Sequence, residues 1–77
     1  MADTYYFIVI QTFVDASPTA KVIYDYADYD TALSALFSTM ASSMANANIK
    51  HVMCMIMNDG GQTIKYEQWD RPVVDNM

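Results

Sequence analysis

Residues 51–69 read His51-Val-Met-Cys-Met-Ile-Met-Asn-Asp-Gly-Gly-Gln-Thr-Ile-Lys-Tyr-Glu-Gln-Trp69, and this stretch decides the fold. The apolar residues 52–57 lead directly into Asn58-Asp-Gly-Gly61. Asp-Gly and Gly-Gly tolerate the positive φ values of tight hairpin turns, and alternating residues after such a turn are typical of a returning strand. The sequence therefore predicts a β-hairpin, which is a prediction of shape and not of chemistry.

Two strands and one helix are predicted before the hairpin. Residues 5–13 are almost all β-branched or aromatic, which favours a central strand covered on both faces. Residues 20–26 alternate more cleanly and indicate an edge strand. A helix is predicted from about Thr31 to about Asn46, with Asp28 or Asp30 as its N-cap and Asn46 or Asn48 in the left-handed conformation at its end.

The helix has two contrasting faces. Its predicted core stripe follows the 3, 4 spacing of one helical face and consists of Leu33, Leu36, Phe37, Met40, Ala41 and Met44. The other face is polar but small, with Ser34, Ser38, Thr39, Ser42 and Ser43, and no charged residue occurs between positions 31 and 49. This smooth face either contacts a second helix or is solvated.

The element order is therefore β-β-α-β-β, in the α+β class. A crossover through the helix makes the second and third strands parallel in direction, so an all-antiparallel four-stranded sheet in spatial order 2-1-3-4 satisfies short connections. One helix packs on one face of this sheet. We predict a single domain over residues 1–72 and a C-terminal tail over residues 73–77.

The pleat of the hairpin predicts which side chains share a face. Met53, Met55 and Met57 share one face with Ile64 and Tyr66, while the other face carries Val52, Cys54 and Ile56 with Thr63, Lys65, Glu67 and Trp69. We assign the methionine face to the helix stripe and expect the Val52/Cys54/Ile56 face to point outward.

A single helix leaves one apolar face of such a sheet uncovered, and an exposed apolar face marks an interface. We expect homodimerisation by sheet stacking or by strand addition at an edge. The alternative is a curled sheet whose second face is covered by the chain's own tail. The interface candidates are Val52, Cys54, Ile56, Trp69, Tyr5, Tyr66 and Arg71.

The amino-acid composition also favours association between copies of the chain. A domain of this size buries only about 60% of the surface that its unfolded chain exposes, so its stability margin is thin. One cysteine excludes an intrachain disulfide, and one His with one Cys is too few for a structural zinc site. Because 53% of the 77 residues are apolar, oligomerisation is the remaining source of stability.

Charge and the N-terminal sequence limit the partners. The net charge of −5 disfavours nucleic-acid backbone and anionic membrane, and it is compatible with a basic protein partner or simply with solubility. The first residues carry Asp3 instead of a basic segment, and their apolar run is too short for a signal peptide or a membrane span. We therefore expect a cytoplasmic protein.

No catalytic motif is present, and we expect neither an enzyme nor a cofactor. His51 and Cys54 are three apart on one strand, so they point to opposite faces and cannot form a close dyad. Asp25, Asp28 and Asp30 lack the glycine and terminal Glu of a calcium loop, and N-capping accounts for one of them, so we expect no metal site.

Six tyrosines and Trp69 are placed mainly at strand ends, where binding surfaces form. An aromatic patch there, with Arg71 nearby, could stack a flat ligand such as a nucleotide base. No Gly-rich phosphate loop supports this alternative.

The runs 52–61 and 65–72, together with Tyr24-Asp-Tyr26 and the Tyr29-Asp-Thr-Ala-Leu33 lead into the helix, resemble small uncharacterised proteins of gut Firmicutes and their phages. The resemblance spans most of the chain and is one of overall pattern. That group has no established activity to carry over to individual residues. It implies a context, because small acidic phage proteins often inhibit bacterial defence systems, as anti-CRISPR proteins or as sponges for signalling nucleotides.

We therefore expect a non-enzymatic binding protein, homodimeric, whose target in a phage context is a host protein. The alternative is an oligomer that sequesters a nucleotide at a subunit junction. An enzyme is the least favoured class, because the sequence offers no nucleophile-base pair.

Overall fold

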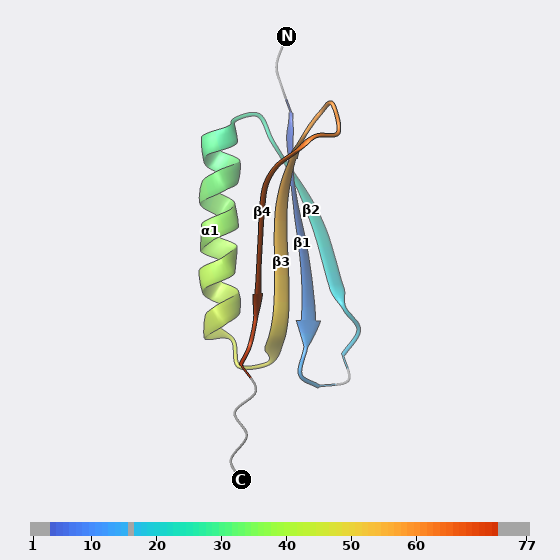
Figure 1. The fold of residues 1–77 in the computed structure, drawn as a ribbon, viewed down its shortest axis with the longest axis vertical. Helices are drawn as coiled ribbons and strands as arrows, with labels where there is room; N and C mark the ends of the chain where they lie inside the picture. Colours follow the sequence, from blue (N-terminus) through green and yellow to red (C-terminus); the bar gives the residue numbers. More distant parts are fainter. Residues whose placement is uncertain (1–3, 16, 73–77) are drawn as a thin grey trace.

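Four strands and one helix form two layers in the computed structural model, which describes residues 4–15 and 17–72. In chain order the elements are β1 (Tyr5–Phe13), β2 (Ala20–Tyr26), α1 (Tyr29–Ala45), β3 (Ile49–Asn58) and β4 (Thr63–Asp70). The strands pair antiparallel in the order β2-β1-β3-β4. Figure 1 shows the helix running along one side of the strands. The predicted class, element order and strand order are confirmed, and the proposed tail, residues 73–77, lies outside the described residues.

The helix begins and ends through local hydrogen bonds. Asp28 is the N-cap, since its Oδ2 accepts from the backbone N and the Oγ1 of Thr31, both at 3.0 Å. Asn46 ends the helix with φ −96° and ψ 108°, and its Oδ1 accepts from the backbone N of Asn48 at 3.0 Å. The predicted left-handed termination is therefore wrong, because the chain leaves the helix directly in an extended conformation. Within residues 4–15 and 17–72, only Gly61 has a positive φ, at 86°.

The β3–β4 turn is held by one asparagine. Asn58 Oδ1 accepts from the backbone N of Gly60 at 3.0 Å and of Gln62 at 2.9 Å, and Asn58 N donates to the carbonyl of Gln62 at 2.9 Å. The register shifts between Ile56 and Met57, so that Met57 pairs with Thr63. Thr63 therefore lies on the methionine face and not on the Val52 face predicted for it, because the shift moves it by one position. Beyond the shift the predicted sharing of faces is confirmed, as in Met55 opposite Tyr66 and Val52 opposite Trp69.

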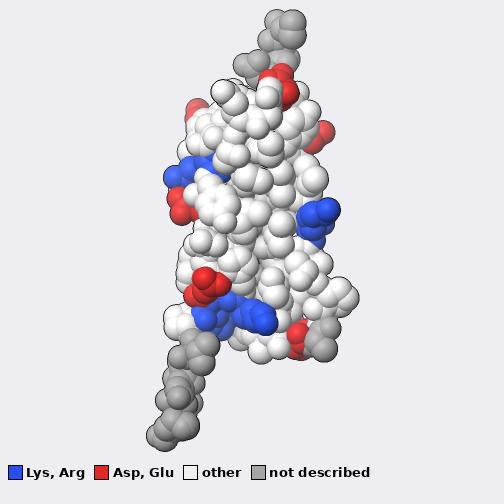
Figure 2. Space-filling view, turned by 45° about the vertical axis from the view of Figure 1, so that its right-hand side comes forward, with Lys and Arg blue, Asp and Glu red and all other residues white. Residues whose placement is uncertain are grey.

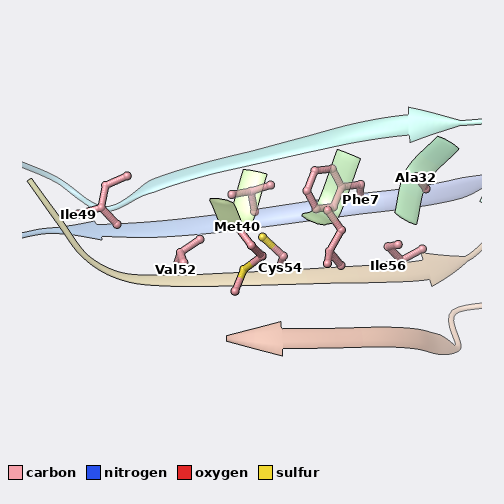
Figure 3. Close-up of a cluster of buried hydrophobic side chains, with 9 residues drawn as sticks. Phe7, Ala32, Met40, Ile49, Val52, Cys54 and Ile56 are labelled. Carbon is pink, nitrogen blue, oxygen red and sulfur yellow. The ribbon is translucent and has the colours of Figure 1, made fainter. Parts of the chain in front are cut away.

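The helix covers the face of the sheet opposite to the one we expected. Val52, Cys54 and Ile56 have no exposed surface and form the core with Phe7, Val9 and residues of α1 (Figure 3). The expectation that these three side chains point outward is therefore wrong. Both faces of β1 and β3 are apolar, so hydrophobicity could not choose between them. Compact Val, Cys and Ile side chains let the helix approach closely, whereas the longer methionines occupy the other face.

The helix is also rotated about its axis relative to the predicted stripe. Its buried residues are Ala32, Leu36, Met40 and Ser43, whereas Phe37 is 51% exposed and Met44 is 42% exposed. Ala41 is exposed as well. The small residues Ala32 and Ser43 face the sheet, and the Ser43 hydroxyl accepts from Gln11 Nε2 at 3.1 Å. This partly buried hydrogen bond satisfies the Ser43 hydroxyl and so removes the penalty that would otherwise keep a serine out of the core.

Arg71 joins the end of β4 to the end of the helix. Its Nε donates to the carbonyl of Ile49 at 2.8 Å, and its Nη2 donates to the carbonyls of Met44 at 3.1 Å and Asn46 at 2.7 Å. The guanidinium also stacks on the Trp69 ring, 4.8 Å from its centroid. The carbonyls of Met44 and Asn46 lie at the negative end of the helix dipole, so a cation here stabilises the helix C-terminus.

We expect Arg71→Ala to lower the free energy of unfolding by about 2 kcal/mol, because charged hydrogen bonds to carbonyls are lost. Arg71→Lys should recover only part of this loss, since an ammonium lacks the planar fork that reaches several carbonyls and stacks on indole. Urea denaturation of the three proteins measures both effects. An Ala variant as stable as the wild type would show that these contacts contribute nothing.

Candidate functional site: the open face of the sheet

The side of the sheet that faces away from α1 carries a grid of side chains, which we call the open face. Its cross-strand rows follow from the pairing register. The rows are Lys21–Ile10–Met53–Gln68, then Ile23–Ile8–Met55–Tyr66, then Asp25–Tyr6–Met57–Thr63, with Thr12, His51 and Asp70 at the far end.

The open face has an apolar centre and a polar margin. Its middle columns carry isoleucine and methionine side chains that are all partly accessible, and Ile23 and Tyr66 at its edges are 54% and 51% exposed. Figure 2, turned so that the side away from the helix comes forward, shows a largely uncharged surface with Lys, Arg, Asp and Glu near its edges. An apolar patch rimmed by polar groups is the usual anatomy of a protein interface.

The interface candidates from the sequence are divided between the two faces. Tyr66 lies on the open face beside Met55. Tyr5 and Trp69 lie on the helix side, where both pack against the core, and the Tyr5 ring is 5.7 Å from the ring of Tyr29. Arg71 and Trp69 do come together, as the sequence suggested, but their groups serve the helix terminus.

Sequence reasoning missed a cross-strand pair on the open face. His51 Nδ1 lies 2.5 Å from Asp70 Oδ1, and the Asp70 side chain is 75% exposed. The sequence predicted only which side chains of the hairpin share a face, and it is the register of the structure that places His51 opposite Asp70. Cys54 lies on the covered face, so the predicted separation of His51 and Cys54 is confirmed. The His51–Asp70 pair thus has no thiol to activate.

Cys54 is a residue of the buried core. It has no exposed surface, and burial raises the pKa of its thiol from the ordinary value of 9.0 to about 11. A thiol is reactive only as the accessible thiolate, so both burial and pKa oppose reaction. We expect thiol reagents to modify Cys54 only after unfolding.

The pKa of Cys54 predicts a loss of stability at alkaline pH. Between pH 9 and about pH 11 the unfolded chain releases the thiol proton while the folded protein retains it, so the free energy of unfolding falls as pH rises. The whole difference of two pKa units corresponds to about 2.7 kcal/mol, of which about 2 kcal/mol is lost by pH 10.5. Urea denaturation at pH 8 and pH 10.5 measures the loss. Cys54→Ala, which keeps every other titrating group, should show a smaller loss, and an equal loss would contradict the assignment.

The rest of the described surface has a further concave feature. A shallow, open depression of about 490 Å³ lies over α1, lined by Tyr26, Asp30, Thr31, Ser34, Ala35 and Ser38. Asp28 caps the helix and Asp25 lies on the open face, so the acidic residues near the helix start do not converge.

Within the part of the chain that the structure describes, no group of three or more His, Cys, Asp or Glu residues is placed to hold a metal ion. In the same residues no helix is long and apolar enough to cross a membrane.

The fold and the open face define a small α+β protein with a two-layer helix-on-sheet architecture. Comparison with protein families, curated proteins and solved structures finds nothing that matches this chain.

Proposed function

We propose that this protein is a non-enzymatic binding protein that works as a homodimer, with the open face as the surface between the two copies. The observation that carries the proposal is the uncovered apolar face of the sheet. Ile8, Ile10, Met53 and Met55 lie at its centre without any element of the described chain packed over them. Burying them against a second copy removes apolar surface from water, at about 25 cal/mol per Å².

A second copy of the chain fits this face better than a charged partner does. The charged side chains lie at the margins of the face, and the centre carries none. The core of a protein interface is depleted in charged residues and enriched in Met and aromatic residues, which fits the methionines and tyrosines of this face. The small size of the domain is a further argument, because association supplies stability that a thin core lacks.

The size of the face predicts the strength of the dimer. Strands lie about 4.8 Å apart and rise about 3.4 Å per residue, so a face four strands wide and seven residues long measures about 450 Å². Two such faces bury about 900 Å², which is less than the roughly 1,200–2,000 Å² of stable interfaces and typical of weak, transient ones. We therefore expect dissociation in the micromolar range.

Light scattering over a dilution series tests the proposal. We expect twice the chain mass of 8.7 kDa at hundreds of micromolar and a fall toward one chain mass on dilution, as mass action requires. A mass of one chain throughout this range would contradict the dimer. A variant that ends at Pro72 is the control for the alternative in which residues 73–77 cover the face, and it should associate as the full chain does.

The target beyond the dimer is part of the same proposal. The net charge of −5 favours a basic protein surface, and the resemblance to small phage proteins favours a host protein as the inhibited target. Once a candidate target is purified, its affinity should fall as salt rises. An affinity that is independent of salt would argue against an electrostatic docking surface.

A further inference from the structure

The open face carries opposite charges at two positions on its β2 edge. Lys21 and Asp25 are both exposed, and each lies two residues from Ile23 on the same side of the strand. At about 3.4 Å per residue, their backbones are about 14 Å apart. The order along β2 is therefore positive, apolar, negative. If a second copy of β2 runs in the opposite direction, the positive residue of each copy lies opposite the negative residue of the other.

Two stacked copies of one sheet are related by a two-fold axis that lies in the plane of the interface, since the two faces must point at each other. If this axis runs along the strands, β2 of one copy lies over β4 of the other. Lys21 then faces Gln68, the β4 residue of its own row, in the other copy. If the axis runs across the strands through the row that contains Ile23 and Met55, β2 lies over its own copy in the reverse direction. Lys21 then faces the partner's Asp25.

We propose that the homodimer has this second geometry, with Lys21 of each copy paired with Asp25 of the partner subunit. The proposal rests on the proposed homodimer and specifies how its two copies are arranged. Isologous contacts come in equivalent pairs, so one surface pattern supplies two ion pairs per dimer.

The rest of the face agrees with this arrangement. Reversal about the Ile23–Ile8–Met55–Tyr66 row places Ile10 over the partner's Tyr6 and Met53 over the partner's Met57, so apolar residues meet apolar residues. Stacked sheets lie about 10 Å apart, a gap that a long lysine and a short aspartate side chain bridge together. The usual angle of about 30° between stacked sheets keeps the two β2 strands crossing near Ile23.

Charge reversal tests the geometry. Lys21→Asp and Asp25→Lys each replace both ion pairs by like-charge contacts, so each variant alone should dimerise about tenfold more weakly than the wild type. An equimolar mixture of the two variants restores opposite charges at both contacts, so it should form a heterodimer about as tight as the wild-type dimer. The double variant should do the same as a homodimer. Both positions are exposed, and far-UV circular dichroism checks that the variants fold.

The outcomes separate this geometry from the homodimer itself. If the wild type dimerises but the single variants match it, or the mixture is no tighter than either variant alone, the dimer stands and this arrangement is wrong. If the wild type has one chain mass at every concentration, both proposals fail. Dimerisation rescued only in the mixture and in the double variant is the expected result.

Discussion

Replacing Met55 by Asp is expected to abolish dimerisation while leaving the fold intact. Met55 lies at the centre of the open face, between Met53 and Met57 on the same side of β3. In the dimer this change would bury an unpaired carboxylate in each copy, near the two-fold axis and close to its symmetry mate. A penalty of about 3 kcal/mol or more follows, which corresponds to at least about a hundredfold weaker association.

Met44→Asp is the matched control, because Met44 is a methionine of α1 that is 42% exposed and lies away from the open face. The same substitution there should leave the dimer mass unchanged, apart from a small loss of stability from an acid near the helix C-terminus. Sedimentation or light scattering of the two variants at the same concentration makes the comparison. If Met55→Asp remained dimeric, the open face would not be the interface.

Replacing the next residue, Ile56, by Asp is expected to unfold the protein. Ile56 has no exposed surface and lies beneath the helix in the core that includes Phe7 and Leu36. An unpaired charge buried there costs about 3 to 5 kcal/mol, which is comparable to the whole stability of a small domain. Circular dichroism should show loss of structure, and Ile56→Val, with a cost of about 1 kcal/mol, should remain folded.

These adjacent substitutions test the assignment of faces, because neighbouring residues of β3 point to opposite sides of the sheet. The structure predicts a folded monomer for Met55→Asp and an unfolded chain for Ile56→Asp. The reverse pair of results would mean that the helix covers the methionine face, as the sequence alone suggested.

Much of the fold could be predicted from the sequence because local signals and connection rules agreed. Asn58-Asp-Gly-Gly61 defined the hairpin and the crossover defined the strand order. The start of the helix was narrowed to Asp28 or Asp30, and Asp28 is the N-cap. The choice of face could not be predicted in the same way. Ile8 and Ile10 on one side of β1 are as apolar as Phe7 and Val9 on the other, so the pattern of hydrophobicity was equally consistent with both assignments.

The rotation of the helix was missed for a related reason. A stripe of large residues through Leu33, Phe37 and Met44 satisfied the helical spacing, but close packing on the sheet favoured Ala32 and Ser43. Buried serine could be recognised only through its hydrogen bond to Gln11, a residue 32 positions away in the chain. The existence of one uncovered apolar face was correctly inferred, but of the predicted interface candidates only Tyr66 lies on it.

Methionine oxidation tests most directly whether the open face is buried against a second copy. Hydrogen peroxide oxidises accessible methionines to the sulfoxide, and peptide mass spectrometry gives the rate at each site. We predict that Met53 and Met55 are oxidised more slowly at high than at low protein concentration, while exposed Met44 reacts at one rate throughout. Rates at Met53 and Met55 that do not change with concentration, in step with Met44, would contradict an interface at the open face.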